Sequence, residues 1–158
     1  MRTLRVAGIA LVAVASTFIG CAGSGGGSGG GGNPCACKPP ATPTVLLSTN
    51  VQPILNRSCA LAGCHAGAVP AQGQDLSAGH TVSSSVCVKS TEIPRLYRIK
   101  PGKPDDSYLV QKIEGTPGIA GIPMPQGCPG SPLNGAQCLS ADDISAIRQW
   151  ITECAQAN

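Results

Sequence analysis

The chain has 158 residues, with 11 lysines and arginines against 8 aspartates and glutamates and a formal net charge of +3. Removing the basic leader described next leaves nine basic and eight acidic residues, and a net charge near +1 argues against a nucleic-acid partner. Only 3% of the residues are aromatic, so a small exported domain of this composition needs disulfides, a metal or a cofactor to complete its interior.

Residues 1–20 have the composition of an export signal. Arg2 and Arg5 form a basic start, and the apolar run 6–19 is too short to span a bilayer. The run ends at Gly20-Cys21, and a small residue directly before a cysteine resembles the cleavage site of bacterial lipoproteins. We therefore predict that Cys21 becomes a lipidated N-terminus; ordinary signal cleavage nearby is the alternative.

Lipidation of Cys21 would anchor the protein to a membrane. Several acyl chains on one residue anchor stably, which one chain does not. Ala22 follows the cysteine where an acidic residue could stand, and the lipoprotein sorting rule then implies the periplasmic face of the outer membrane of a Gram-negative cell. No second hydrophobic segment of the sequence is long enough to span.

Residues 21–44 are predicted to be a tether, and residues 45–158 the folded domain. Residues 22–32 are glycine and serine with one alanine, a flexible composition that reaches on the order of 20 Å as a random coil. Residues 33–43 contain four prolines together with Cys35 and Cys37, which predicts an extended arm, pinned to the domain if these cysteines are bridged.

The first predicted helix begins near residue 51. Apolar residues recur there at helical spacing: Val51, Ile54, Leu55 and Cys59. Ser48, Thr49 or Asn50 is the expected N-cap, and Pro53 is tolerable in the first turn. This helix leads directly into the sequence Cys59-Ala-Leu-Ala-Gly-Cys64-His65.

Two cysteines ahead of a histidine are what covalent haem attachment requires, because each thiol can add to one haem vinyl group while the imidazole ligates the iron. Four residues separate Cys59 from Cys64, where the usual motif has two. At i and i+5 two side chains of a helix diverge by about 140°, so the helix must break here, and Gly63 supplies the backbone freedom. The alternative is a disulfide beside an ordinary histidine.

The middle of the chain is rich in proline and glycine, which predicts loops with short helical turns near residues 91–98 and 106–113. Met124 is the only methionine beyond the initiator, and Pro123 and Pro125 hold it in a stiff loop. A thioether in such a loop can serve as the second axial ligand of a haem iron and raise its potential. The alternative is a methionine that only fills the core.

The last predicted helix covers residues 141–154. Ser140 and Asp143 have the spacing of a capping box, and Ile144, Ile147, Ile151 and Cys154 share one face.

The number of cysteines limits how they can be used. If Cys21 is lipidated, eight cysteines remain, so using both haem cysteines or neither leaves an even number for disulfides. Cys128 with Cys138 is the expected local pair, because the segment between them has the composition of a loop.

This order of elements resembles class I cytochrome c domains, and four segments are similar to the planctomycete-type cytochrome c domain: Val51-Gln-Pro-Ile-Leu, Lys100-Pro-Gly-Lys-Pro-Asp-Asp-Ser-Tyr-Leu, Pro123-Met124-Pro125 and Leu139-Ser-Ala-Asp-Asp-Ile-Ser-Ala-Ile-Arg-Gln-Trp150-Ile. The resemblance implies a mainly α, cytochrome c-like fold with long proline- and glycine-rich loops and disulfides. It also implies haem c attached at Cys59 and Cys64, with His65 and Met124 as the iron ligands.

The function predicted from the sequence is that of a lipid-anchored, periplasmic monohaem electron carrier that passes electrons to an unidentified redox protein. No enzyme is expected and no small-molecule substrate is implied, because the sequence contains no nucleophile-base pair, metalloprotease motif or phosphate-binding loop. The rival is a haem-free, disulfide-linked envelope lipoprotein that acts as a binding or scaffold module.

Overall fold

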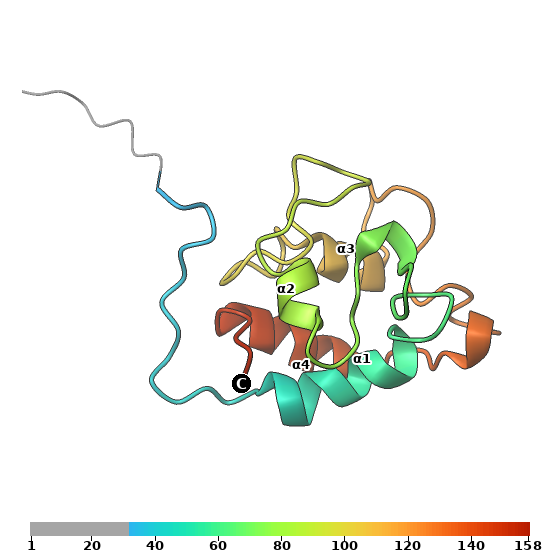
Figure 1. Cartoon of the computed structure of the whole chain (residues 1–158), viewed down its shortest axis with the longest axis horizontal. Coiled ribbons are helices and arrows are strands. Elements are labelled where there is room, and N and C mark those ends of the chain that lie inside the picture. The colour runs from blue at the N-terminus through green and yellow to red at the C-terminus, as the bar shows by residue number, and fades with distance from the viewer. Residues whose placement is uncertain (1–31) are drawn as a thin grey trace, which may run out of the picture. The chain divides into compact units, whose positions relative to one another are not determined.

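The computed structural model describes residues 32–158, which form a small, mainly helical domain with long loops (Figure 1). Its α-helices are α1 (Gln52–Ser58), α2 (Thr81–Ser85), α3 (Tyr108–Glu114) and α4 (Ala141–Thr152). Single turns of other helix types are η1 (Leu47–Val51), η2 (Ala71–Gly73) and η3 (Leu133–Gly135). Within residues 32–158 there are isolated β-bridges but no strands. The predicted mainly α class with long loops is confirmed.

The predicted leader and Cys21 lie outside the described residues. From residue 32 onward, no helix combines the length and the apolar character needed to cross a membrane.

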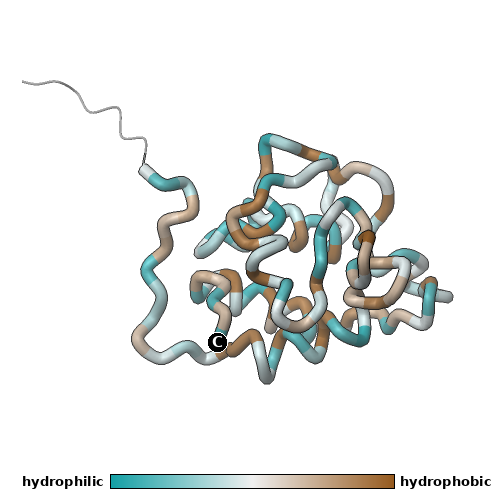
Figure 2. The backbone as a smooth tube through the Cα atoms, viewed as in Figure 1, coloured by the Kyte–Doolittle hydropathy of each residue, from teal (hydrophilic) through white to brown (hydrophobic). Residues whose placement is uncertain are grey.

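The core of the domain is built from the first helical segment and α4. Its largest fully buried side chains include Leu55, Ile147, Trp150 and Ile151. Hydrophobic and hydrophilic residues are interleaved along the helices (Figure 2), as expected where one face is buried and the other meets water. The Trp150 indole satisfies its polar atom locally, because Nε1 donates to the carbonyl of Gln156 at 2.9 Å.

The start of the first helix differs from the prediction. A π-helical turn, η1, precedes α1, and its N-cap is Leu46, which makes no side-chain capping bond. Asn50, one of the expected caps, instead accepts a hydrogen bond from the Leu46 N–H at 2.9 Å. Pro53 does lie in the first turn of α1, as expected. The cap prediction was wrong because the chain already turns helically at Leu47, before the polar residues.

Helix α4 follows the prediction closely. Ser140 Oγ accepts from the Asp143 N–H at 3.1 Å, while the Asp143 carboxylate accepts from the Ser140 N–H at 3.0 Å, which completes the capping box. Between these helices, α3 agrees with the turn predicted at 106–113, whereas residues 91–98 contain no helix, only bends, a turn and the β-bridges of Tyr97. Helix α2 had no clear sequence signal.

Three disulfides hold the loops and the arm. Cys128–Cys138 closes the proline-rich loop, as predicted. Cys35–Cys87 and Cys37–Cys154 fasten the N-terminal arm to the middle and to the C-terminal end of the domain. Six of the eight cysteines in residues 32–158 are therefore paired, and Cys59 and Cys64 are free.

The arm is also held by the buried side chain of Glu153, just after α4. Its carboxylate accepts hydrogen bonds from the backbone and hydroxyl of Thr44, the amide of Gln149 and the Val45 N–H. These bonds lower the pKa of Glu153 from 4.5 to about 2, and the bond from the Thr44 hydroxyl has the largest effect. A carboxyl group whose pKa falls on folding stabilises the folded state above its unfolded pKa, and this contribution is lost as the pH falls from about 4.5 to about 2.

Replacing Glu153 with glutamine should therefore lower the urea midpoint of unfolding at pH 7, and should remove part of its fall between pH 5 and pH 2. Urea titrations at several pH values measure both effects. Asp106→Asn is a matched control, because it neutralises an exposed carboxylate whose partner is Lys100, and it should leave the midpoint nearly unchanged. Equal midpoints for Glu153→Gln and the parent protein at pH 7 would contradict the proposed role of this carboxylate.

Candidate functional site

The segment that joins α1 to His65 breaks the helix where the sequence predicted a break. Helix α1 ends at Ser58, and its C-cap residue, Cys59, has non-helical backbone angles. Tight turns follow, in which the Leu61 N–H and the His65 N–H both donate to the carbonyl of Cys59, at 2.9 and 3.1 Å. Gly63 has a positive φ of 79°, a conformation that glycine adopts without strain.

His65 is held in one orientation by the backbone that follows it. Its Nδ1 atom lies 3.1 Å from the carbonyl oxygen of Gln74 and must be the protonated nitrogen, because a carbonyl can only accept. Nε2 is then the unprotonated nitrogen, with its lone pair free. Burial lowers the pKa of His65, which keeps the ring neutral at pH 7. A neutral, oriented imidazole of this kind is suited to ligate a metal.

The two free thiols lie on either side of this turn and differ in exposure. Cys59 is buried, and burial, with the nearby Cys64, raises its pKa to about 12. Cys64 is partly exposed, and its sulfur accepts a hydrogen bond from the amide of Asn134 at 3.3 Å. The thiol of Cys59 thus remains protonated at neutral pH.

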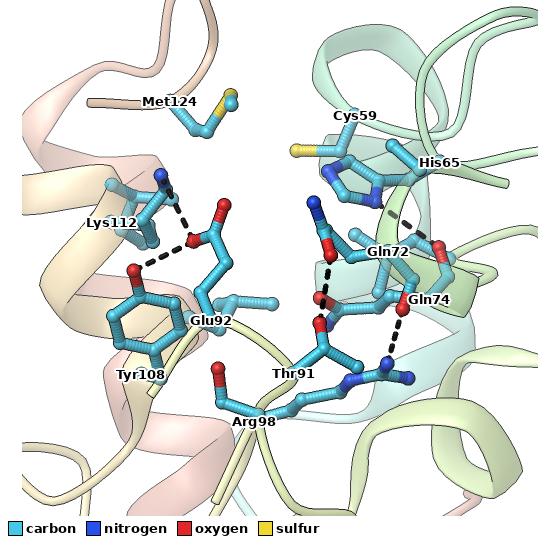
Figure 3. Close-up of a pocket in the computed structure, with 15 residues that line it drawn as sticks. Cys59, His65, Gln72, Gln74, Thr91, Glu92, Arg98, Tyr108, Lys112 and Met124 are labelled. Atoms are coloured by element: carbon cyan, nitrogen blue, oxygen red, sulfur yellow. Dashed lines mark hydrogen bonds and ion pairs between the residues drawn. The ribbon is translucent and has the colours of Figure 1, made fainter. Parts of the chain in front are cut away.

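Met124 lies in a loop that is fastened to α3. Its N–H donates to the carbonyl of Lys112 at 2.8 Å, and prolines flank it on both sides. The side chain is partly buried and lines the same cavity as Cys59 and His65. Figure 3 shows Met124 on one side of this cavity, with Cys59 and His65 on the other.

The cavity has two adjoining parts, of about 150 and 210 Å³, which share the lining residues Cys59, His65, Ala71 and Met124. We call the first part the charged end and the second the uncharged end. The charged end is further lined by Glu92, Arg98, Tyr108 and Lys112, among others. The uncharged end is further lined by Ser58, Cys64, Leu133 and Asn134, among others. All four residues predicted to bind haem therefore lie around one hollow.

A polar cluster at the charged end was not predicted from the sequence. The Tyr108 hydroxyl donates to Glu92 Oε2 at 2.7 Å, and Lys112 Nζ lies 3.4 Å from the same oxygen. Lys112 also donates to the carbonyl of Ala120 at 2.8 Å, and only 8% of its surface is exposed. Burial raises the pKa of Tyr108, so its hydroxyl remains a donor. A buried lysine is tolerated because it is paired and hydrogen-bonded.

Of the three basic residues Arg95, Arg98 and Lys100, only Arg98 lines the cavity. Its guanidinium donates to the backbone carbonyls of Gln72, Gly73 and Ser84, and so holds η2 against the end of α2. Lys100 instead pairs with Asp106 at 2.8 Å. The other histidine, His80, is exposed and lies 4.0 Å from Asp75, away from the cavity lining.

No family model, curated protein or solved structure matches this chain. The fold and the site by themselves define a small, mainly helical, disulfide-linked domain. One cavity of this domain is lined by one imidazole, one thioether and two free thiols.

Proposed function

We propose that this protein is a membrane-tethered monohaem electron carrier of the c type, acting on the periplasmic side of the outer membrane. The supporting observation is the make-up of one cavity, where two free thiols and a neutral imidazole meet a methionine. Covalent haem attachment uses two thiols beside a histidine, and a methionine is a frequent second axial ligand in such carriers.

The pairing of the cysteines supports the same function. Each of the other six cysteines in residues 32–158 is in a disulfide, and only the pair beside His65 is left free. Thiols of exported proteins usually become oxidised to disulfides. Two thiols reserved at a histidine fit a covalent partner other than cysteine.

The cavity also has features that a large flat cofactor would satisfy. The buried hydroxyl of Ser58, at the uncharged end, has no hydrogen-bond partner among residues 32–158. Among residues 32–158 as a whole, no three His, Cys, Asp or Glu side chains are grouped so that they could hold a metal ion. Ligands on opposite walls, His65 and Met124, therefore fit an iron carried in a macrocycle better than a bare ion.

Bound haem would supply an iron that takes up and releases one electron. Cys59 and Cys64 would hold the group through thioether bonds, while His65 and Met124 would ligate the iron from its two faces. Leu76, Leu109 and Ile113 line the charged end and would give the bound group an apolar contact surface. The chain itself then contributes burial, orientation and ligation, and no bond-making step on a substrate.

The experiment that tests this proposal is the intact mass and visible spectrum of the protein made in a periplasm with haem-attachment machinery. A denaturing gel stained for covalent haem accompanies it. A haem-sized gain in mass with a reduced c-type spectrum is the expected result. Alkylation of the same sample should leave Cys59 and Cys64 unmodified, because both sulfurs would be thioethers.

A colourless protein would overturn the proposal. The alkylation pattern of the colourless protein would then show whether Cys59 and Cys64 form a disulfide. If all eight cysteines of residues 32–158 resist alkylation, Cys59 and Cys64 have paired, and the protein is the haem-free, disulfide-linked scaffold or binding module.

The membrane anchor has its own test. Replacing Cys21 with serine should release the protein from the membrane fraction into the soluble periplasm, because no acyl chains can then be attached at residue 21. Fractionation followed by immunoblotting measures the change, with the parent protein as the control. Continued membrane association of the Cys21→Ser variant would refute lipidation as the means of anchoring.

A further inference from the structure

The orientation of the His65 imidazole depends on one short turn of the chain, residues 71–75. The carbonyl of Gln74 in this turn accepts from Nδ1 at 3.1 Å, and in Figure 3 the other ring nitrogen points into the cavity. A neutral imidazole donates from only one nitrogen, so a displaced carbonyl would let the ring rotate or change its tautomer. Whatever holds this turn therefore determines where the lone pair of Nε2 is directed.

The backbone of the turn is strained. Gln72 has a φ of 55° and a ψ of 20°, in the left-handed region that favours glycine, and Gly73 follows with a φ of 64°. A residue other than glycine keeps such a conformation only where its surroundings fix it. The side chain of Gln72 is held by the Thr91 hydroxyl, which donates to Oε1 at 2.9 Å. The backbone of the turn needs a support of its own.

Arg98 provides this support. Its guanidinium donates to the carbonyl of Gln72 and, at 3.0 Å, to that of Gly73, in the two peptide units directly before Gln74. A third bond, at 2.7 Å, goes to the carbonyl of Ser84 near the end of α2. The planar fork of one arginine thus ties the strained turn to a helix, and the single ammonium of a lysine cannot reproduce that geometry.

The guanidinium of Arg98 is committed to these carbonyls. Only 7% of the residue is exposed, and none of the ion pairs among residues 32–158 includes it. A buried charge without a carboxylate is costly unless other acceptors satisfy it, and here backbone oxygens do so. The backbone of Arg98 is itself fixed, because its N–H donates to Val88 at 2.7 Å and its carbonyl accepts from the Leu109 N–H at 2.9 Å.

We propose that Arg98 is the residue that positions His65. By holding the carbonyls of Gln72 and Gly73, it fixes the carbonyl of Gln74, which keeps the ring proton on Nδ1 and directs the lone pair of Nε2 into the cavity. Arg98 thus acts on the imidazole through the backbone. These contacts need no haem, whereas the purpose of the orientation, ligation of iron, rests on the proposed function.

The test is the exchange of the His65 Nδ1 proton with solvent, followed by NMR at pH 8 in the mature chain carrying Cys21→Ser. If the sample contains haem it is reduced first, so that the low-spin iron is diamagnetic. Arg98→Lys keeps the positive charge but loses the fork, and it should speed this exchange about tenfold. An unchanged exchange rate in Arg98→Lys would overturn the proposal.

Two controls separate local support from overall stability. Arg148→Lys makes the same chemical change at an arginine that pairs with Asp105 and Glu114 and does not line the cavity, so the exchange of the His65 proton should stay close to that of the parent. Glu153→Gln weakens the domain at the arm and should also leave this exchange nearly unchanged. Acceleration in Glu153→Gln equal to that in Arg98→Lys would mean that the proton reports only overall stability, and would overturn the proposal.

A measurement on the parent protein needs no Arg98 variant to fold. A guanidinium held by three carbonyls cannot rotate freely, so the Nη protons of Arg98 should give separate, slowly exchanging NMR signals. A single averaged signal would overturn the proposal.

The visible spectrum of each sample, recorded first, separates this inference from the proposed function. A colourless protein removes the proposed function, but the exchange of the His65 proton still tests the role of Arg98. The ring nitrogen shifts then give a second measure: one tautomer in the parent and two in Arg98→Lys are expected, and one tautomer in both would overturn the proposal. A haem-loaded protein whose exchange ignores Arg98→Lys removes this inference alone.

Discussion

Replacing His65 with alanine should abolish the low-spin haem spectrum of the protein while leaving the haem covalently attached. The reason lies in how the ring is held: Nδ1 donates to the carbonyl of Gln74 at 3.1 Å, so Nε2 is free to ligate and the backbone fixes its direction. No other histidine lines the cavity in the described part of the chain to replace it. Visible absorption of the purified variant, oxidised and reduced, measures the loss.

The other histidine provides the control for this experiment. His80 is exposed, with Asp75 as its nearest charged neighbour, so His80→Ala should retain the low-spin spectrum in full. A His65→Ala protein that still shows a low-spin spectrum would mean that another residue ligates the iron. In each case the intact mass shows that haem is covalently attached, and the absence of alkylation at Cys59 and Cys64 shows that both thioether bonds are intact.

Replacing Met124 with alanine should lower the reduction potential by about 0.1 V or more without releasing the haem. Axial ligands set haem potentials over a range of about 0.8 V, and a thioether favours the reduced iron. The Met124 loop is fastened to α3 through the carbonyl of Lys112, so the backbone should keep its position when the side chain is shortened. A spectroelectrochemical titration gives the potential.

Ile122→Ala is the matched control for Met124→Ala, because it shortens an apolar side chain on the same loop that is exposed and does not line the cavity. Its potential should match that of the parent protein. If the potential of Met124→Ala is also unchanged, Met124 is not an iron ligand, and the proposed coordination would have to be completed by another group.

Features with a local cause could be predicted from the sequence. The capping box at Ser140 and Asp143 involves residues three apart, and the Cys128–Cys138 disulfide closes a short loop. The end of α1 near Cys59 followed from the spacing of the cysteines and from Gly63. In each case the residues that decide the structure are neighbours in the chain.

Features that depend on distant residues could not be predicted. The disulfides of Cys35 and Cys37 span 52 and 117 residues, and sequence alone leaves many pairings open. The approach of Glu92 to Lys112 and Tyr108 depends on how the loop before Arg98 packs on α3, for which no periodic signal exists. The gathering of the site residues around one cavity likewise requires the complete fold.

The early start of the first helix shows a further limit of local signals. Ser48, Thr49 and Asn50 are good N-cap residues by type, yet all three lie inside the η1 turn. Contacts with the C-terminus hold this turn, because the Leu47 and Ser48 N–H groups both donate to Asn158, at 2.8 Å. A partner more than a hundred residues away has here outweighed the preference of the capping residues.

The two disulfides of the N-terminal arm also determine how far the domain can stand from a membrane. If Cys21 carries the lipid, only residues 22–34 remain between the anchor and the first cystine at Cys35, a stretch that spans at most roughly 45 Å when fully extended. The residues from Cys35 to Thr44 add nothing to this length, because they are fixed to the domain at Cys87, Cys154 and Glu153. Each molecule would thus move in a thin layer above the bilayer, where a small number of copies amounts to a high local concentration.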